Sequence, residues 1–258
     1  MSPRSAEVTY LRRLIEDFPS DTNPEKAGKA LQTIAVRYQS IESEQYFKGI
    51  SASDLKELDL SRNLPDILKQ RAFLIHKFLF KDILSNAGET RKSSDPGSGT
   101  IGFGGTKHQR QRMRFKGTNP PKIDKELDKA FSHLVLEPED PIENAMRFYQ
   151  HFVYIHPFYD ANGRIGRVIV STYLNLFGYY VQWGEFDGPN NSKFINKLNA
   201  CHDRMESGYT FEQYFGYLLS FFKKYVISVD ELSDFKWWMI SFEESHRLYL
   251  KVSVSFHT

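Results

Sequence analysis

Hydrophobic residues recur along most of the chain at intervals of three and four, which is the spacing of one face of an α-helix. The pattern predicts helices whose ends carry proline, asparagine, aspartate or glycine signals, over about 24–49, 65–88, 140–156, 164–178 and 211–222. Residues 89–120 break the pattern, because Ile101 and Phe103 alternate with other residues, as do Met113 and Phe115 further on. We therefore expect a mainly α-helical fold interrupted by a β-hairpin.

The segment 156–167 concentrates reactive side chains in a loop between two predicted helices; it reads His-Pro-Phe-Tyr-Asp-Ala-Asn-Gly-Arg-Ile-Gly-Arg. His156 can take a proton near neutral pH, because imidazole titrates there. Asp160 is a hard oxygen ligand of the kind that Mg²⁺ binds together with substrate phosphates. The first half of the segment thus predicts a general base beside a metal ligand.

The second half of the segment predicts a phosphate site. Gly163 lets a phosphate approach the backbone, at the start of a helix whose first N–H groups and dipole attract anions. Arg164 and Arg167 are three residues apart, so on a helix they share one face and can both reach an anion. Together the two halves favour a Mg²⁺-bound polyphosphate next to a proton acceptor.

These residues resemble the signature of Fic-domain proteins, roughly His-Pro-Phe-x-Asp/Glu-Gly-Asn-Gly-Arg-x-x-Arg. The match departs from the signature at Ala161, where glycine is commonest. The related Doc toxins also carry alanine there, but have lysine where this chain has Gly163, which favours the nucleotide-transferring branch. The resemblance implies a Fic-type helical bundle with a β-hairpin flap. It also implies transfer of AMP from ATP to a Ser, Thr or Tyr hydroxyl of a target protein, with Mg²⁺ as cofactor.

The resemblance also implies a role for each motif residue. His156 would be the general base, Asp160 would position Mg²⁺ on the α- and β-phosphates, and Phe158 would anchor the loop in the core. The phosphate-binding roles would fall to Asn162, Gly163, Arg164 and Arg167.

The predicted hairpin, at about 100–117, resembles the flap on which Fic proteins dock a target strand by main-chain pairing. Four basic residues would project from one face of its second strand: Arg110, Arg112, Arg114 and Lys116. A basic stripe attracts nucleic-acid phosphates. Because the net charge of the whole chain is close to zero, a solvated strand face or a surface for an acidic target is the favoured interpretation.

Two further segments resemble parts of the family outside the motif. Phe194 and Asn199 lie where an aromatic residue and an asparagine close over adenine, although Phe194 could equally be a core residue and Asn199 a surface amide. Ser40 and Glu44 resemble the pattern Ser/Thr-x-x-x-Glu-Gly/Asn of an inhibitory helix, whose glutamate pairs with the second motif arginine. The segment departs from the pattern at Gln45, where the pattern has glycine or asparagine. Glu42 is the alternative inhibitory residue.

Composition narrows the remaining possibilities. The chain has 258 residues, 40% of them hydrophobic. Its net charge of only +2 argues against a general nucleic-acid binder, and its single cysteine excludes an internal disulfide. It shows neither a signal-peptide pattern at its start nor an apolar run of membrane-spanning length, so we expect a cytoplasmic protein without a membrane partner.

The predicted organisation has three parts: an N-terminal helical region at 1–70 with the inhibitory segment, a Fic core at 71–230 and a C-terminal extension at 231–258 whose role the sequence does not indicate. Transfer of UMP or phosphocholine, removal of AMP and non-enzymatic nucleotide binding remain alternative functions. The oligomeric state stays open, with a homo-oligomer among the possibilities.

Overall fold

Helices dominate the structure, as the hydrophobic pattern predicts. The computed structural model describes residues 33, 36–37, 64–81, 86–104, 114–183, 189–205 and 209–228. In chain order the helices are α4 (Leu64–Phe80), α5 (Ile123–Phe131), α6 (Pro141–Ile155), α7 (Asn162–Asn175), α8 (Pro189–His202) and α9 (Tyr209–Phe222). Short 3-10 turns occupy η2 (Pro96–Gly99), η3 (Pro120–Lys122) and η5 (Lys223–Tyr225). The strands β1 (Gly102–Phe103) and β2 (Phe115–Lys116) form one antiparallel pair, and β3 (Tyr179–Val181) and β4 (Val226–Ser228) form another.

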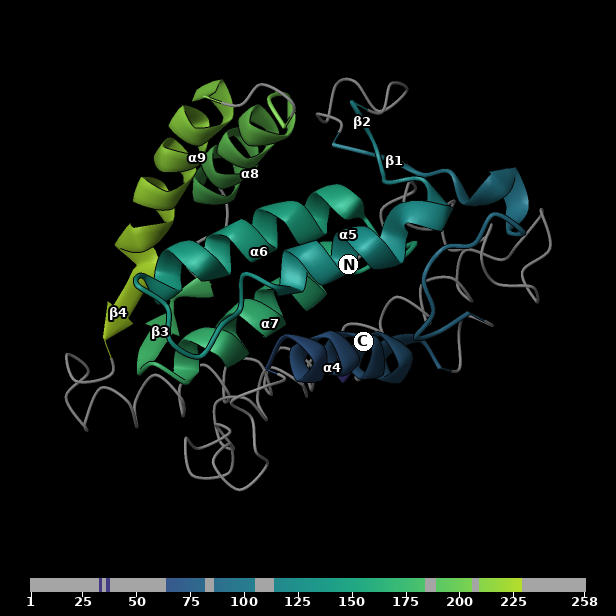
Figure 1. Ribbon diagram of the computed structural model, residues 1–258, viewed down its shortest axis with the longest axis horizontal. Coiled ribbons are helices and arrows are strands. Elements are labelled where there is room, and N and C mark those ends of the chain that lie inside the picture. The colour runs from purple at the N-terminus through teal and green to yellow at the C-terminus, as the bar shows by residue number, and fades with distance from the viewer. Residues whose placement is uncertain are drawn as a thin grey trace, which may run out of the picture.

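Helices α6 and α7 lie side by side in the middle of the fold, with α4 on one side and the α8–α9 pair on the other (Figure 1). Their contact is made by the apolar faces that the sequence pattern predicts, including Tyr149 and Phe152 of α6 and Ile165 and Ile169 of α7, all at most 2% exposed. A Cβ atom on Gly166 would lie 3.0 Å from two ring carbons of Tyr149, so this glycine allows the close approach of the two helices.

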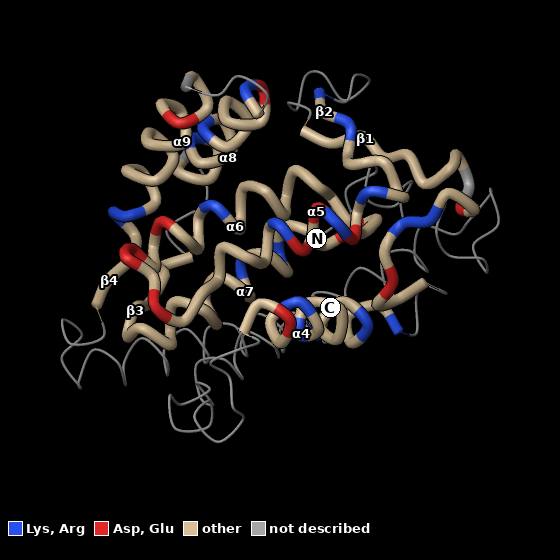
Figure 2. The backbone as a smooth tube through the Cα atoms, in the orientation of Figure 1, with Lys and Arg blue, Asp and Glu red and all other residues tan. Residues whose placement is uncertain are grey.

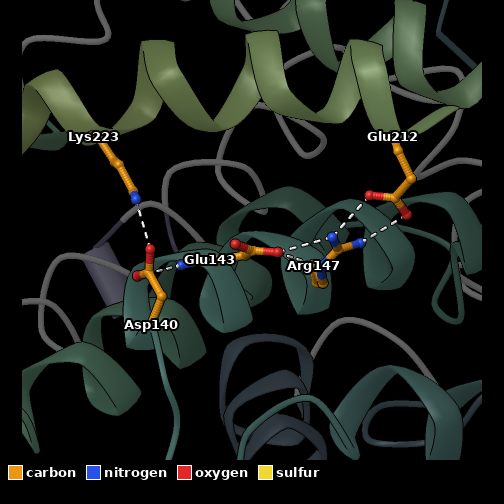
Figure 3. Close-up of polar contacts among 5 residues, drawn as sticks. All are labelled: Asp140, Glu143, Arg147, Glu212 and Lys223. Carbon is orange, nitrogen blue, oxygen red and sulfur yellow. Dashed lines mark hydrogen bonds and ion pairs between the residues drawn. The ribbon is translucent and has the colours of Figure 1, made fainter. Parts of the chain in front are cut away.

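Capping and ion pairs fix α6 against α9 (Figure 3). The Asp140 carboxylate accepts two first-turn N–H groups of α6, at 2.9 and 3.0 Å, and pairs with Lys223 at 2.6 Å. One turn after Glu143, Arg147 lies 2.8 Å from both Glu143 and Glu212. These contacts join the start of α6 to α9 and to the turn after it, at the opposite end of α6 from the motif loop.

The helix predicted at 65–88 is shorter in the structure. α4 ends at Phe80, and Gly88 lies in a separate turn with a φ of 82°, where its N–H group donates to His76 Nδ1 at 2.8 Å. Glycine therefore serves a turn here, because the left-handed region costs it no Cβ clash. Two predicted apolar positions of this helix, Leu74 and Phe78, are 67% and 41% exposed.

Helices α5 and α8 and the β3–β4 pair were absent from the sequence prediction. Helix α5 packs on α6 through buried Ile123, Leu127 and Phe131. The β3–β4 pair joins the segment after α7 to the segment after α9, with Tyr180 opposite Ile227. All of them lie in the described part of the predicted core.

The predicted β-hairpin is confirmed. Strands β1 and β2 pair with Phe103 opposite Phe115 and Gly102 opposite Lys116. In Figure 1 the hairpin stands beside the helices, near the end of α6 that leads into the motif. The part of the hairpin at 105–113, which includes Met113, lies outside the described residues.

Three other predictions fall mostly or wholly outside the described residues. Of the helix predicted at 24–49, the structure describes Thr33, Val36 and Arg37 in helical conformation, and Arg37 Nη1 donates to the Leu79 carbonyl at 3.1 Å. The inhibitory segment and the extension at 231–258 are not among the described residues.

Basic and acidic residues are interspersed along the described helices (Figure 2). Within the described ranges, no helix is both long enough and apolar enough to cross a membrane.

Candidate active site

His156 ends α6 in a left-handed conformation, with φ 52° and ψ 58°. Its N–H group still donates to the Phe152 carbonyl at 3.1 Å, and Pro157 follows, which disfavours helical geometry in the residue before it. The backbone therefore turns sharply at the histidine, and the side chain leaves the helix where the motif loop begins.

The His156 ring is held as a neutral proton acceptor. Burial lowers its pKa from 6.5 to about 4; the Val153 carbonyl opposes this shift and the nearby Arg91 charge adds to it. Nδ1 lies 3.4 Å from the Val153 carbonyl oxygen, an arrangement that favours the tautomer with the proton on Nδ1 and the lone pair on Nε2. Phe103 of the hairpin stacks on the imidazole, with ring centroids 4.5 Å apart and planes at 14°.

The motif loop is braced from inside. The Asn162 side chain accepts from the Phe158 N–H group at 3.0 Å and donates to the Phe158 carbonyl at 2.8 Å, and it is only 3% exposed. Phe158 is fully buried, stacked on His76 at 4.0 Å and edge-on to Phe73 at 5.3 Å. Phe158 is therefore the loop anchor that the sequence indicates. Asn162 shapes the loop, and its contact with a phosphate stays a prediction.

Ala161 occupies the position where the signature most often carries glycine. Its φ of 61° lies in the left-handed region, which costs a residue with a Cβ atom roughly 1–2 kcal/mol. The Asp160 carboxylate accepts the Ala161 N–H group at 2.6 Å and so supports this turn locally. The conformation explains why glycine suits the position, and the chain tolerates alanine at some cost in stability.

Helix α7 presents its N-terminus to the loop. Ala161 is the N-cap residue and has no polar side chain, so the cap leaves the first-turn N–H groups open to an anion. A Cβ atom on Gly163 would meet a single atom within 4 Å, the Tyr149 hydroxyl oxygen at 3.7 Å, which is an ordinary contact. Protein packing therefore does not require glycine at 163, whereas close approach of a ligand to the backbone would.

Asp160 and the two motif arginines surround this helix end. Asp160 Oδ2 lies 3.1 Å from Arg164 Nη2, and both side chains are about one third exposed, at 28% and 34%. The Arg167 guanidinium carbon lies 5.2 Å from the centre of the Trp183 ring, and Arg167 Nη2 is 3.5 Å from Asn191 Oδ1. The site thus combines an open helix N-terminus, two guanidinium groups and a partly exposed carboxylate.

Asp160 suits a magnesium ion that arrives with its substrate. Among the described residues, no group of three or more histidine, cysteine or acidic residues is arranged to hold a metal ion. Mg²⁺ commonly binds through one or two carboxylates and completes its shell with phosphates and water. Asp160, which is partly exposed, could supply one carboxylate ligand to a Mg²⁺ ion of this kind.

The hairpin closes the site from the His156 side. Phe103, Phe115, Tyr154 and His202 form an aromatic cluster, in which His202 meets both hairpin phenylalanines edge-on at 5.8 and 5.3 Å. Of the predicted basic stripe, Arg114 is paired with Asp203 at the end of α8 and Lys116 is exposed, while Arg110 and Arg112 lie outside the described residues.

The two predicted adenine contacts lie on α8 in different surroundings. Phe194 is 0% exposed and packs on Tyr149 at 5.8 Å, so the core alternative describes it, and its ring offers no face to a nucleotide in this structure. Asn199 is 8% exposed and lies next to Gly104 of the hairpin: a Cβ atom added to Gly104 would be 3.6 Å from Asn199 Oδ1. The role of Asn199 at adenine stays a prediction.

The structure adds residues that the sequence did not single out. Arg91 is 1% exposed and bonds to the His156 carbonyl at 2.8 Å. His202 is 4% exposed, and burial lowers its pKa to about 4. Trp183 lies against Arg167. Arg91 and His156 are 65 positions apart, Phe115 and His202 are 87 apart, and Arg167 and Trp183 are 16 apart, so no local pattern marks these residues. Ser40, Glu44 and Glu42 lie outside the described residues.

Residues 66–174 match the Fic/DOC family. The matched segment is therefore a Fic/DOC family domain, and it contains the whole motif, all of α6 and all but the last residue of α7. The match agrees with the resemblance noted from the sequence. No curated protein matches the chain.

Solved structures of Fic proteins resemble the fold. The N-terminal Fic domain of a putative cell filamentation protein from Bartonella quintana, solved with bound ADP, has a TM-score of 0.51 and 15% identity; the match covers 81% of this chain and 88% of that one. BepC from Bartonella tribocorum, solved with bound AMPPNP, has a TM-score of 0.49 and 17% identity over 87% and 99% of the two chains. A Fic family protein from Desulfovibrio desulfuricans has a TM-score of 0.45 and 16% identity. The match covers 85% of this chain but only 58% of that protein's length.

Proposed function

We propose that the protein is an adenylyltransferase that moves AMP from ATP to a serine, threonine or tyrosine hydroxyl of a target protein. The observation that carries the proposal is the neutral His156 imidazole beside the open N-terminus of α7. The hydroxyl oxygen bonds to the α-phosphorus, the bond from that phosphorus to the oxygen bridging to the β-phosphate breaks, and pyrophosphate leaves. The hydroxyl proton passes to His156 Nε2.

The low pKa of His156 supports its role as the base. Because the imidazole is neutral at physiological pH, its Nε2 lone pair is available before the substrate binds. Approach of a triphosphate would add negative charge beside the ring, which favours the protonated form and so strengthens the base as the reaction proceeds.

The end of α7 supports the choice of a nucleotide triphosphate. N–H groups near Gly163 would receive phosphate oxygens, and Arg164 and Arg167 would neutralise the β- and γ-phosphates. A Fic domain of similar fold from Bartonella quintana holds ADP, which agrees with a nucleotide at this site. Asp160 would hold Mg²⁺, which supplies further neutralisation of phosphate charge when bound. The protein contributes alignment and charge, and little covalent chemistry.

The hairpin would present the target. Its exposed edge would add a strand from the target protein by main-chain hydrogen bonds, which places one side chain of that strand over His156. The stacking of Phe103 on His156 supports this placement, because the first hairpin strand then adjoins the base.

The test uses ATP labelled at either the α- or the γ-phosphorus, incubated with the purified protein and a cell lysate. We expect label on protein only from the α position, and a decrease of roughly 10²–10⁴-fold in His156→Ala, which should still bind ATP. His151→Ala is the matched control, because His151 lies on the same helix and pairs with Glu126 at 3.3 Å, on the α5 side. Label from the γ position, or equal labelling by the His156 variant, would overturn the proposal.

Parallel reactions with labelled UTP and CDP-choline, and with an AMP-modified protein, measure the alternative transfers and AMP removal. Binding of ATP without any transfer would instead indicate a nucleotide-binding regulator.

We also propose that the N-terminal region inhibits the enzyme through Glu44, which would pair with Arg167 and turn the γ-phosphate away. The support is the sequence pattern at Ser40 and Glu44 together with one described contact. Arg37, three residues before Ser40, donates to the Leu79 carbonyl near the end of α4. Since α4 packs against α7, the helix that carries the motif arginines, this contact places Arg37 on a neighbour of that helix.

A further inference from the structure

Arg91 is a buried cation at the junction between the hairpin and the motif loop. Its side chain donates to four backbone carbonyl groups: His156 at 2.8 Å, Thr118 at 2.7 Å, Ile155 at 3.3 Å and Gly99 at short range. Its own N–H group donates to the Pro157 carbonyl at 3.0 Å. Arg91 is 1% exposed, so its side chain is buried among the backbone groups that it bonds.

The four carbonyl groups belong to three segments that are distant in sequence. Gly99 precedes β1, Thr118 follows β2, and Ile155 and His156 end α6. The Thr118 N–H group also donates to the Ile155 carbonyl at 3.0 Å, so the base of the hairpin is bonded to α6 as well. Both legs of the hairpin and the residue that carries the base therefore meet at one side chain.

The end of α6 explains how a cation is tolerated here. The last carbonyl groups of a helix have no partner within it and carry a partial negative charge, and a basic side chain can satisfy them. Arginine suits the site better than lysine, because its planar group holds five N–H donors in fixed directions, whereas lysine has three at one point.

Packing at the junction leaves no spare room. A Cβ atom on Gly117 would lie 2.9 Å from Ile101 Cγ2, 3.0 Å from Arg91 Nη2 and 3.2 Å from His156 Cβ. The second leg of the hairpin thus presses directly on the arginine and on the histidine.

We propose that Arg91 is a positioning residue that fixes the hairpin to His156, so that a strand docked on the hairpin presents its hydroxyl at a set distance from the base. The consequence for transfer rests on the proposed function. The mechanical link between the hairpin and α6 does not. Displacement of a reacting group by about 1 Å can cost on the order of 10²-fold in rate.

The experiment compares Arg91→Lys and Gly117→Ala in the full chain. The first keeps the charge and removes the fork of donors; the second keeps Arg91 and wedges a methyl group into the junction. Arg147→Lys is the control for the first, since Arg147 lies in the first half of α6 and pairs with Glu212 of α9, away from the junction. Gly216→Ala is the control for the second, since nothing lies within 4 Å of its added Cβ atom. The readouts are AMP transfer to protein, ATP affinity and hydrogen exchange at the amides of 117 and 118.

We expect both junction variants to transfer AMP about 10²-fold more slowly, with ATP affinity within about twofold of wild type. Exchange at the two amides should speed up in both, and the controls should behave as wild type. If folded Arg91→Lys and Gly117→Ala keep the wild-type transfer rate and exchange, the proposal is wrong. Should Arg91→Lys fail to fold, Gly117→Ala decides the matter alone.

A wild-type protein that transfers no AMP would refute the proposed function and leave the junction to be judged by exchange. Faster exchange at 117 and 118 in the junction variants would then still support the link, and unchanged exchange would refute it.

Discussion

Gly163→Ala should raise the stability of the protein and weaken its binding of ATP. The added Cβ atom would meet the protein only at the Tyr149 hydroxyl oxygen, 3.7 Å away, so no clash opposes it. Alanine is favoured over glycine in a helix by up to about 1 kcal/mol, and position 163 is the second residue of α7. For a chain of this size, each kcal/mol raises the melting temperature by about 2–4 °C.

The same methyl group would stand where a phosphate is expected to approach the backbone. Loss of one hydrogen bond to a charged group costs about 1.5–3 kcal/mol, which corresponds to roughly 10–150-fold weaker ATP binding. Stability and affinity should therefore change in opposite directions, which general damage to the fold would not produce.

Thermal unfolding followed by circular dichroism and ATP titration by calorimetry measure the two effects on the same samples. Gly166→Ala is the matched control, because its Cβ atom would lie 3.0 Å from two Tyr149 ring carbons. Overpacking of this kind costs about 1–3 kcal/mol in stability, and the folded protein should bind ATP as wild type does. If Gly163→Ala bound ATP with unchanged affinity, the placement of the phosphate at the start of α7 would be wrong.

Three further predictions test other parts of the site and fold. Asp160→Asn should weaken the Mg²⁺-dependent binding and transfer of the nucleotide, while its amide oxygen still accepts the Ala161 N–H group. If a Mg²⁺ titration of AMP transfer is unchanged in this variant, Asp160 does not hold the metal. Glu44→Gly should raise auto-modification with α-labelled ATP and Glu42→Gly should not, and activation by the second change alone would move the inhibitory register by two residues. Burial lowers the pKa of His76 to about 3 and of His202 to about 4, so these residues bind protons more readily unfolded, and stability should fall as the pH drops from about 7 towards 4. Urea unfolding at several pH values should show about 1.4 kcal/mol per pH unit for each histidine near pH 5, and a flat profile would contradict their burial as neutral groups.

The sequence by itself was enough to predict the elements around the motif. The apolar faces of α6 and α7 recur at helical spacing, and Asp140 with Pro141 marks a helix start, so these helices and the loop between them follow from local signals. The hairpin followed from alternation and glycine. Chemistry in the loop was also readable, because the candidate base, carboxylate and arginines all fall within twelve consecutive positions of the printed sequence.

Local patterns gave weaker guidance where an element is short. Helix α5 carries buried residues at 123, 127 and 131, a helical spacing that extends over only nine residues. Strands β3 and β4 contain three residues each and pair across more than forty positions, so neither is long enough to show a period.

Tertiary structure alone decided how the loop is held and what surrounds its base. The sequence left Phe194 open between a core residue and an adenine contact, and only packing shows that it lies in the core. Arg91 stands in a polar stretch with nothing to distinguish it from a surface residue, yet its four carbonyl partners come from segments up to 65 positions away. A sequence pattern records what neighbours in the chain share, whereas the burial of a charge and the pKa of a histidine depend on groups that folding alone brings together.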